Sequence, residues 1–132
     1  MPYLLDTNIC IYIIKKAPQA VLDKFNSISP EQIAISTISI AELEYGARKS
    51  SQIDNNLRSL RKFLSPFKIL NFDDQAATEY GVIKAALAIN GTPIGPMDSL
   101  IAAHARSINY TLVTNNTKEF ARVSGLILEN WV

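Results

Sequence analysis

Short runs of apolar residues alternate along this chain with longer stretches in which apolar positions recur at helical spacing. The short runs predict strands at residues 3–5, 33–36, 68–71, 111–114 and 126–128. The longer stretches predict helices at 9–16, 18–27, 39–49, 53–64, 73–89, 97–107 and 117–121. Continuous apolar strands separated by helices are typical of a parallel sheet that is covered on both faces. We therefore expect a three-layer α/β/α sandwich with a mostly parallel sheet of four or five strands.

Composition and length narrow the class of protein. The 132 residues fit one domain, residues 1–132, and a hydrophobic content of 48% with 19% charged residues excludes a disordered chain. Cys10 and His104 are the only cysteine and histidine, so neither an intramolecular disulfide nor a zinc site with the usual ligands is expected. No signal-peptide pattern and no apolar stretch long enough to cross a bilayer is found in the sequence, and we expect no membrane association and a cytoplasmic location.

Four acidic residues lie where a predicted strand gives way to a helix. Asp6, Glu42 and Glu119 fall beyond the carboxyl ends of strands, which is where open parallel sheets bind ligands. Asp98 comes from the start of the helix after the Gly/Pro-rich loop at 90–96. Carboxylate oxygens are the ligands of hard cations such as Mg²⁺, which also bind phosphates. The four acids therefore predict a divalent-cation site and phosphodiester chemistry.

Helix capping is the simpler alternative for three of these acids. Asp6 can cap the helix that follows it, and residues 39–42 and 116–119 both fit the spacing of a capping box. Each such cap contributes about 1 kcal/mol and is common. Taken one at a time, these acids are explained at least as well by capping as by metal binding.

Asp98 is harder to explain as a cap. Its neighbours one turn along the helix are Ile101 and Ala102, so its face of the helix is apolar. A carboxylate there is costly unless it is paired, capped or bound to a metal. One shared metal site also accounts for all four acids together.

Other chemistries find little support. The chain has no G-x-S-x-G elbow, P-loop or G-x-G-x-x-G motif. A phosphoacceptor of the response-regulator type would need paired acids and a lysine that the pattern does not place. We expect His104 to have a packing or surface role, and Cys10 to be a small core residue.

Two further features suggest binding surfaces. The apolar run at residues 9–14 is too dense for an ordinary amphipathic helix, so it is either fully buried or partly covered by a partner chain. A net charge of +1 requires any RNA site to be a local basic patch. The candidates are Arg48, Lys49, Arg58, Arg61 and Lys62, for which a solvated helix face is an equally good interpretation.

Four segments in this order resemble the PIN-domain ribonucleases and, among them, the VapC toxins of type II (VapBC) toxin–antitoxin pairs. They are residues 4–10 (LLDTNIC), 41–46 (AELEYG), 95–102 (GPMDSLIA) and 113–120 (VTNNTKEF), and the closing residues 129–131 (ENW) are also similar. The resemblance covers nearly the whole chain.

The resemblance implies a Mg²⁺- or Mn²⁺-dependent endoribonuclease that acts as a toxin. It implies that Asp6, Glu42 and Asp98 hold the ion and that Glu119 completes the pocket or orders a water. It also implies supporting hydrogen bonds from Thr7, Thr114 and Asn116. The partners that the resemblance implies are a second copy of the chain, a VapB-type antitoxin and RNA. The expected RNA is a tRNA cut in its anticodon region, which would stop translation.

One departure from the family pattern leaves an alternative open. Many PIN domains carry an aspartate one or two residues after the threonine, where this chain has Asn115 and Asn116. The alternative function is a catalytically degenerate PIN-like module that binds RNA or protein.

Overall fold

The computed structural model describes residues 2–132, in which five strands form one parallel sheet. The strands are β1 (Tyr3–Leu5), β2 (Ile33–Ser36), β3 (Lys68–Leu70), β4 (Thr111–Val113) and β5 (Leu128–Glu129). Their order in the sheet is β3-β2-β1-β4-β5, and every neighbouring pair is parallel. The predicted sheet is confirmed.

The helices agree with the prediction to within two residues at each end. They are α1 (Thr7–Lys15), α2 (Gln19–Asn26), α3 (Thr37–Arg48), α4 (Ile53–Leu64), α5 (Asp74–Ile89), α6 (Pro96–Ser107) and α7 (Thr117–Phe120). A short 3₁₀ helix at Pro30–Gln32 was not predicted. None of the helices in residues 2–132 combines the length and the apolar character that a membrane span requires.

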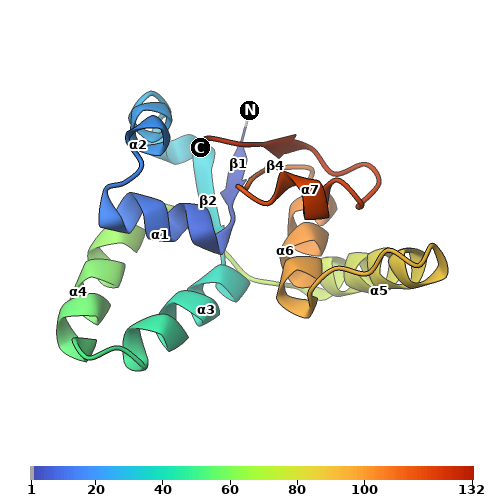
Figure 1. The fold of residues 1–132 in the computed structure, drawn as a ribbon, viewed down its shortest axis with the longest axis horizontal. Helices are drawn as coiled ribbons and strands as arrows, with labels where there is room; N and C mark the ends of the chain where they lie inside the picture. The colour runs from blue at the N-terminus through green and yellow to red at the C-terminus, as the bar shows by residue number, and fades with distance from the viewer. Residues whose placement is uncertain (1) are drawn as a thin grey trace.

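Side chains that alternate along each strand build two separate cores. Leu5, Ile35 and Val113 pack with α1, α2 and α4 in what we call the α1-side core. The intervening Leu4, Ala34 and Leu112 pack with α5, α6 and α7 in the α6-side core. Figure 1 shows α1, α2 and α4 on one side of the strands and α5 and α6 on the other. Both faces of β1, β2 and β4 are buried, so these central strands are mainly apolar, whereas the edge strand β3 is largely exposed and begins with Lys68. The three-layer prediction is confirmed.

The apolar run at residues 9–14 is only partly buried. Ile9, Cys10 and Ile13 belong to the α1-side core, whereas Ile11 and Ile14 remain half-buried. Cys10 is a core residue, as predicted, and burial raises the pKa of its thiol, which makes it unreactive. The uncovered side of α1 is therefore available to a partner.

Parallel pairing places the ends of β1, β2 and β4 at one edge of the sheet. The Asp6 N–H donates to the Val113 carbonyl oxygen at 2.9 Å, which joins the ends of β1 and β4. Because α6 returns to the start of β4, it begins at the same edge. Asp98, at the start of α6, is thereby brought to the edge at which β1 ends in Asp6.

Candidate active site

Asp6 is held by hydrogen bonds to both of its carboxylate oxygens. Oδ1 accepts from the Thr7 N–H at 2.8 Å, and Oδ2 accepts from Thr114 Oγ1, also at 2.8 Å. The residue is 5% exposed. Burial, together with a smaller contribution from the negative charge of Glu42, raises the pKa of Asp6, although these two hydrogen bonds act to lower it. Asp6 thus caps α1, as the capping alternative predicted, but its bond to Thr114 also ties it to β4.

Glu42 does not cap α3. Thr7 Oγ1 donates to Glu42 Oε1 at 2.6 Å and lies 3.2 Å from the Ser39 hydroxyl. The N-cap of α3 is Ser36, whose Oγ accepts from the Ile38 N–H at 3.1 Å. The predicted capping box at 39–42 is therefore wrong, because the buried serine that ends β2 caps the helix three residues earlier. Glu42 is left free to face Thr7.

The raised pKa of Asp98 is the clearest indication that this group of acids binds a positively charged ligand. Burial raises the pKa of Asp98 to about 6, with further contributions from the negative charges of Asp6, Glu119 and Glu42. The four predicted acids are thus close enough to affect one another. A carboxyl whose ionisation is opposed by burial and by three other carboxylates is suited to a positive ligand.

Glu119 is engaged at both oxygens. Oε1 accepts from the Gly95 N–H at 3.0 Å, and Oε2 accepts from Asn116 Nδ2 at 2.8 Å. These two bonds, that of Gly95 first, lower the pKa of Glu119. The predicted capping box at 116–119 is also wrong, because the Asn116 side chain donates to Glu119 and makes no cap bond to α7.

Thr114 and Asn116 connect two of the acids. The Asn116 N–H donates to Thr114 Oγ1 at 3.0 Å, and Thr114 in turn donates to Asp6. Since Asn116 also holds Glu119, a continuous path of hydrogen bonds runs from Asp6 to Glu119. Asn115 takes no part in it, because its amide donates to the Tyr12 hydroxyl at 3.3 Å.

Gly95 was missed by the sequence analysis. A side chain there would point at the acids, since an added Cβ would lie 3.7 Å from Asp98 Oδ2 and 4.0 Å from Glu119 Oε1. The available signal was a glycine directly before Pro96, at the start of the helix that carries Asp98. Its lack of a side chain leaves space beside the two carboxylates.

The donor set fits a hard divalent cation. The acids supply carboxylate oxygens, the ligands that Mg²⁺ and Mn²⁺ prefer. Within residues 2–132, however, no three His, Cys, Asp or Glu side chains already stand close enough to enclose an ion. A bound ion would have to draw the carboxylates together. Burial and, to a smaller extent, the neighbouring negative charges raise the pKa of Asp98, and a positive ion would oppose both effects.

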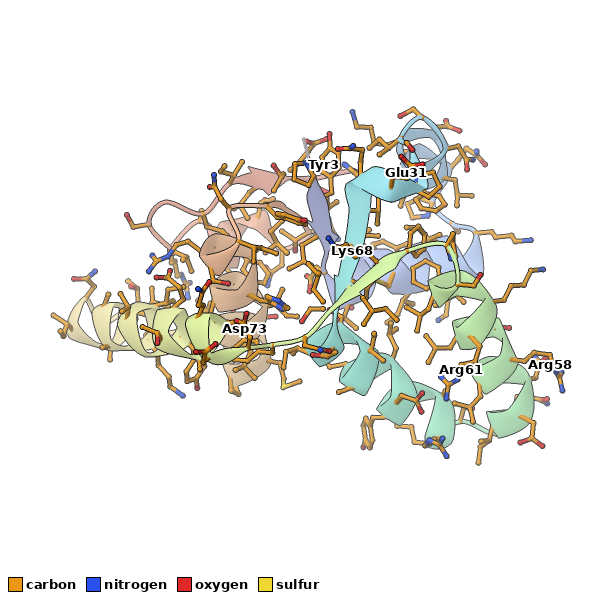
Figure 2. All side chains as sticks on the ribbon, turned by 180° about the vertical axis from the view of Figure 1, so that it is seen from behind. Tyr3, Glu31, Arg58, Arg61, Lys68 and Asp73 are labelled. Atoms are coloured by element: carbon orange, nitrogen blue, oxygen red, sulfur yellow. The ribbon has the colours of Figure 1, made fainter. Side chains whose placement is uncertain are left out.

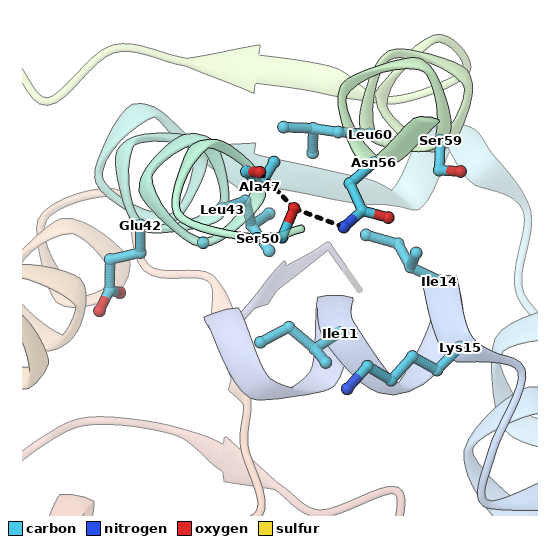
Figure 3. A pocket seen from close by; sticks show the side chains of 11 residues that line it. Ile11, Ile14, Lys15, Glu42, Leu43, Ala47, Ser50, Asn56, Ser59 and Leu60 are labelled. Atoms are coloured by element: carbon cyan, nitrogen blue, oxygen red, sulfur yellow. Dashed lines mark hydrogen bonds between the residues drawn. The ribbon is translucent and has the colours of Figure 1, made fainter. Parts of the chain in front are cut away.

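A groove of about 510 Å³ adjoins Glu42, between α1, α3 and α4. We call it the α1–α3–α4 groove. Figure 3 shows Ile11 and Ile14 along one wall and Glu42 at one end. Ser50 and Asn56, joined by a 2.9 Å hydrogen bond, line it between α3 and α4. The half-buried side of α1 is thus a wall of this groove.

The five basic candidates lie on the outer surfaces of α3 and α4, and Figure 2 shows two of them, Arg58 and Arg61, along α4. Glu44 binds both Arg48, at 3.0 Å, and Arg61. Lys49 lies 5.0 Å from the centre of the Tyr45 ring. All five are exposed, so the RNA-binding role stays a prediction.

The chain is similar to known proteins along nearly its whole length. The PIN domain family profile matches residues 3–126. The chain is 46% identical over 131 residues to the tRNA(fMet)-specific endonuclease VapC of Shigella flexneri. The aligned region covers 99% of this chain and 98% of that protein. It is also 46% identical over 132 residues to ribonuclease VapC2 of Haemophilus influenzae, covering 100% and 99%.

Solved structures show the same fold. The structure of VapBC2 from Rickettsia felis bound to a promoter DNA fragment contains a chain that matches with a TM-score of 0.93 and 44% identity over the full length of both chains. In the DNA-bound VapBC of Salmonella typhimurium the TM-score is 0.94, with 42% identity over 100% of this chain and 99% of that one. The chain belongs to the PIN domain family, and within it to the VapC ribonucleases of toxin–antitoxin pairs.

Proposed function

We propose that this protein is a Mg²⁺- or Mn²⁺-dependent endoribonuclease toxin that cuts a tRNA in its anticodon region and so stops translation. Its similarity to an endonuclease named for tRNA(fMet) supports the substrate class. A tRNA substrate would place the activity in the cytoplasm. The observation that carries the proposal is Asp98, a carboxyl with a pKa raised to about 6 by burial and by three neighbouring carboxylates.

Asp6, Glu42 and Asp98 would hold the ion. A bound ion would supply a water of lowered pKa and a positive charge against the scissile phosphate. Thr7 and Thr114 orient the carboxylates of Glu42 and Asp6 by direct hydrogen bonds. Hydrogen bonds of this kind fix the orientation of metal-binding side chains and so preserve the geometry of the site.

Glu119 would play a different part from the other three acids. Both of its oxygens already accept hydrogen bonds, which commits them to Gly95 and Asn116. It thereby holds the start of α6 in place and, opposite Asp98, can order a water in the pocket.

The α1–α3–α4 groove would receive a segment of a VapB-type antitoxin. Its walls are largely apolar, and its Glu42 end favours a basic side chain from the partner. The similar Rickettsia and Salmonella chains come from VapBC complexes, which supports such a partner. A second copy of the chain would bind at α5, where Val82 and Ile89 are 53% and 84% exposed.

The test is cleavage of RNA by the purified protein with Mg²⁺, with Mn²⁺ and with a chelator. Asp6→Asn and Asp98→Asn should abolish cleavage, whereas Glu31→Gln, an exposed acid outside the site, should not. Activity that survives chelation or Asp98→Asn would refute the proposal. Sequencing of RNA ends after brief induction in cells tests the substrate, because cuts scattered over messenger RNA would contradict a tRNA target.

The degenerate binding module is the second candidate. It is favoured by Asn115 and Asn116 in place of an acid. A metal-loaded protein that binds RNA without cutting it would support this function.

A further inference from the structure

His104 is buried in α6 although the proposed reaction does not use it. Its exposed fraction is 2%, and its ring packs against the edge of Phe72 at 5.5 Å between centroids. The predicted packing role is therefore correct but incomplete, because Nδ1 lies 2.7 Å from Ser36 Oγ. A buried polar contact across 68 positions of sequence joins α6 to the end of β2.

Ser36 is the point at which β2 becomes α3. Its hydroxyl accepts the Ile38 N–H and so caps the helix. Burial lowers the pKa of His104, which favours a neutral ring, and a neutral ring can accept the remaining hydroxyl proton at Nδ1. One lone pair and the proton of the Ser36 hydroxyl then have partners.

A second contact holds the same turn of α3. Thr37 Oγ1 accepts from the Phe72 N–H at 3.1 Å, and Phe72 is the residue whose ring meets His104. The first turn of α3 is thus located by α6 on one side and by the chain after β3 on the other.

The helices joined in this way carry two of the proposed metal ligands. Glu42 lies six residues after Ser36, and Asp98 lies six residues before His104. At 1.5 Å per residue, each ligand is about 9 Å along its helix from the contact. A shift of α3 against α6 at this contact therefore changes the separation of the Glu42 and Asp98 carboxylates.

We propose that His104 is a positioning residue that, through Ser36 Oγ, fixes α3 against α6 and sets the spacing of Glu42 and Asp98. The inference rests on the proposed function, since it concerns the same acids. His104 itself touches neither the substrate nor the ion. Its effect should therefore be on metal affinity and kcat, with little change in the KM for RNA.

The experiment compares two substitutions at His104. His104→Phe keeps a ring against Phe72 but has no nitrogen for Ser36, whereas His104→Asn places a hydrogen-bonding atom close to the position of Nδ1. Ile83→Val, a core substitution in α5, lowers stability without touching the contact. For each variant we would measure the unfolding transition, Mn²⁺ affinity of the protein alone, kcat and KM.

We expect His104→Phe to lower kcat and weaken Mn²⁺ binding by up to about tenfold, the low end of the range for direct partners of metal ligands, because His104 acts through Ser36. His104→Asn should restore most of both, and Ile83→Val should change neither. In the His104→Phe background, Ser36→Ala should lower the unfolding transition, because it also removes the cap of α3, but should add little further loss of kcat, because the contact with His104 is already gone.

Wild-type kcat and Mn²⁺ affinity in a folded His104→Phe protein would overturn the inference. So would equal losses in the Phe and Asn variants. If His104→Phe does not fold, kcat and Mn²⁺ affinity are measured on Ser36→Ala instead. Wild-type values of both in that variant would also overturn the inference. A wild-type protein that neither binds Mn²⁺ nor cuts RNA would instead refute the proposed function.

Discussion

The carboxyl groups of Asp98 and Glu119 contact each other, and their pKa values move in opposite directions. The pKa of Asp98 rises to about 6, chiefly through burial, whereas hydrogen bonds from Gly95 and Asn116 lower the pKa of Glu119. Below about pH 6, a proton bound by this pair therefore resides on Asp98. In the proposed nuclease, a divalent ion would take the place of that proton.

The first prediction concerns stability without metal. Because the pKa of Asp98 is higher in the folded chain than in the unfolded one, the folded state binds more protons between about pH 4 and pH 6, and its stability falls as pH rises through that window. Asp98→Asn should raise the free energy of unfolding at neutral pH by on the order of 1 kcal/mol, allowing for partial exposure, and by little near pH 4. Denaturant unfolding with chelator present measures this, with Glu31→Gln as control.

The second prediction concerns proton competition with the metal. Below about pH 6, Asp98 holds a proton that the ion must displace. Mn²⁺ affinity should therefore fall by about tenfold for each pH unit below that value, and level off above it. Titration of the purified protein with Mn²⁺ at several pH values tests this. An affinity that does not change with pH would show that Asp98 is not a ligand.

The third prediction concerns Thr114, whose hydroxyl donates to the buried Asp6 carboxylate. Thr114→Val should cost about 1–3 kcal/mol of stability by leaving that oxygen without its donor, and about tenfold or more in kcat. Thr111→Val is the matched control, because it makes the same change in a buried threonine at the other end of β4. Equal effects of the two substitutions on kcat would contradict the role given to Thr114.

The fourth prediction concerns the α1–α3–α4 groove. A Cβ added to Gly46, which lines the groove, meets nothing within 4 Å, so a longer side chain can enter the space without disturbing the fold. Gly46→Gln should weaken antitoxin binding by at least about tenfold, or 1.4 kcal/mol, and leave the proposed α5 dimer intact. Binding of the antitoxin to immobilised toxin measures this. Unchanged affinity would place the antitoxin elsewhere.

The fifth prediction concerns α5 and provides the reciprocal control. Gly81 also has open space around an added Cβ and is exposed beside Val82. Gly81→Glu should shift the protein towards monomer by at least about tenfold in Kd, because it puts a charge into an apolar contact, and should leave antitoxin binding unchanged. Sedimentation or light scattering measures the oligomeric state. A dimer of undiminished stability would exclude α5 from the interface.

Features of the structure that depend on residues close together in the sequence were mostly predicted correctly, and hydrogen bonds between residues far apart in the sequence were mostly not. Leu4 and Leu5 are both apolar because both faces of the sheet are buried, and this local pattern was enough to predict a strand and the Asp6 position that follows it. The helical repeat of α6 likewise put Asp98 one turn before Ile101 and Ala102, both of which are buried. The spacing of apolar residues can be recognised in the sequence because it depends only on whether each residue is itself buried.

Capping shows where the sequence alone was insufficient. Ser36 and Ser39 are both candidate caps for this helix, and the spacing of Ser39 to Glu42 favours Ser39 in the sequence. The end of β2 is set by its pairing with β3, in which Ser36 lies opposite Leu70, and that pairing determines which serine meets the free N–H groups. Capping is a local interaction, but its position here was decided by a neighbouring strand.

The remaining features of the site depend on contacts between distant parts of the chain. Thr7 reaches Glu42, Thr114 reaches Asp6, and Ser36 reaches His104 across 35, 108 and 68 positions of sequence. The raised pKa of Asp98 likewise results from burial and from charges on other elements. The sequence by itself determined which carboxylates lie at the ends of strands and the starts of helices, because the burial of each residue is reflected in the apolar pattern along the chain. Which of them meet, and which hydroxyl or amide holds each one, was decided only by tertiary structure, because hydrogen bonds and electrostatic fields act through space and not along the chain.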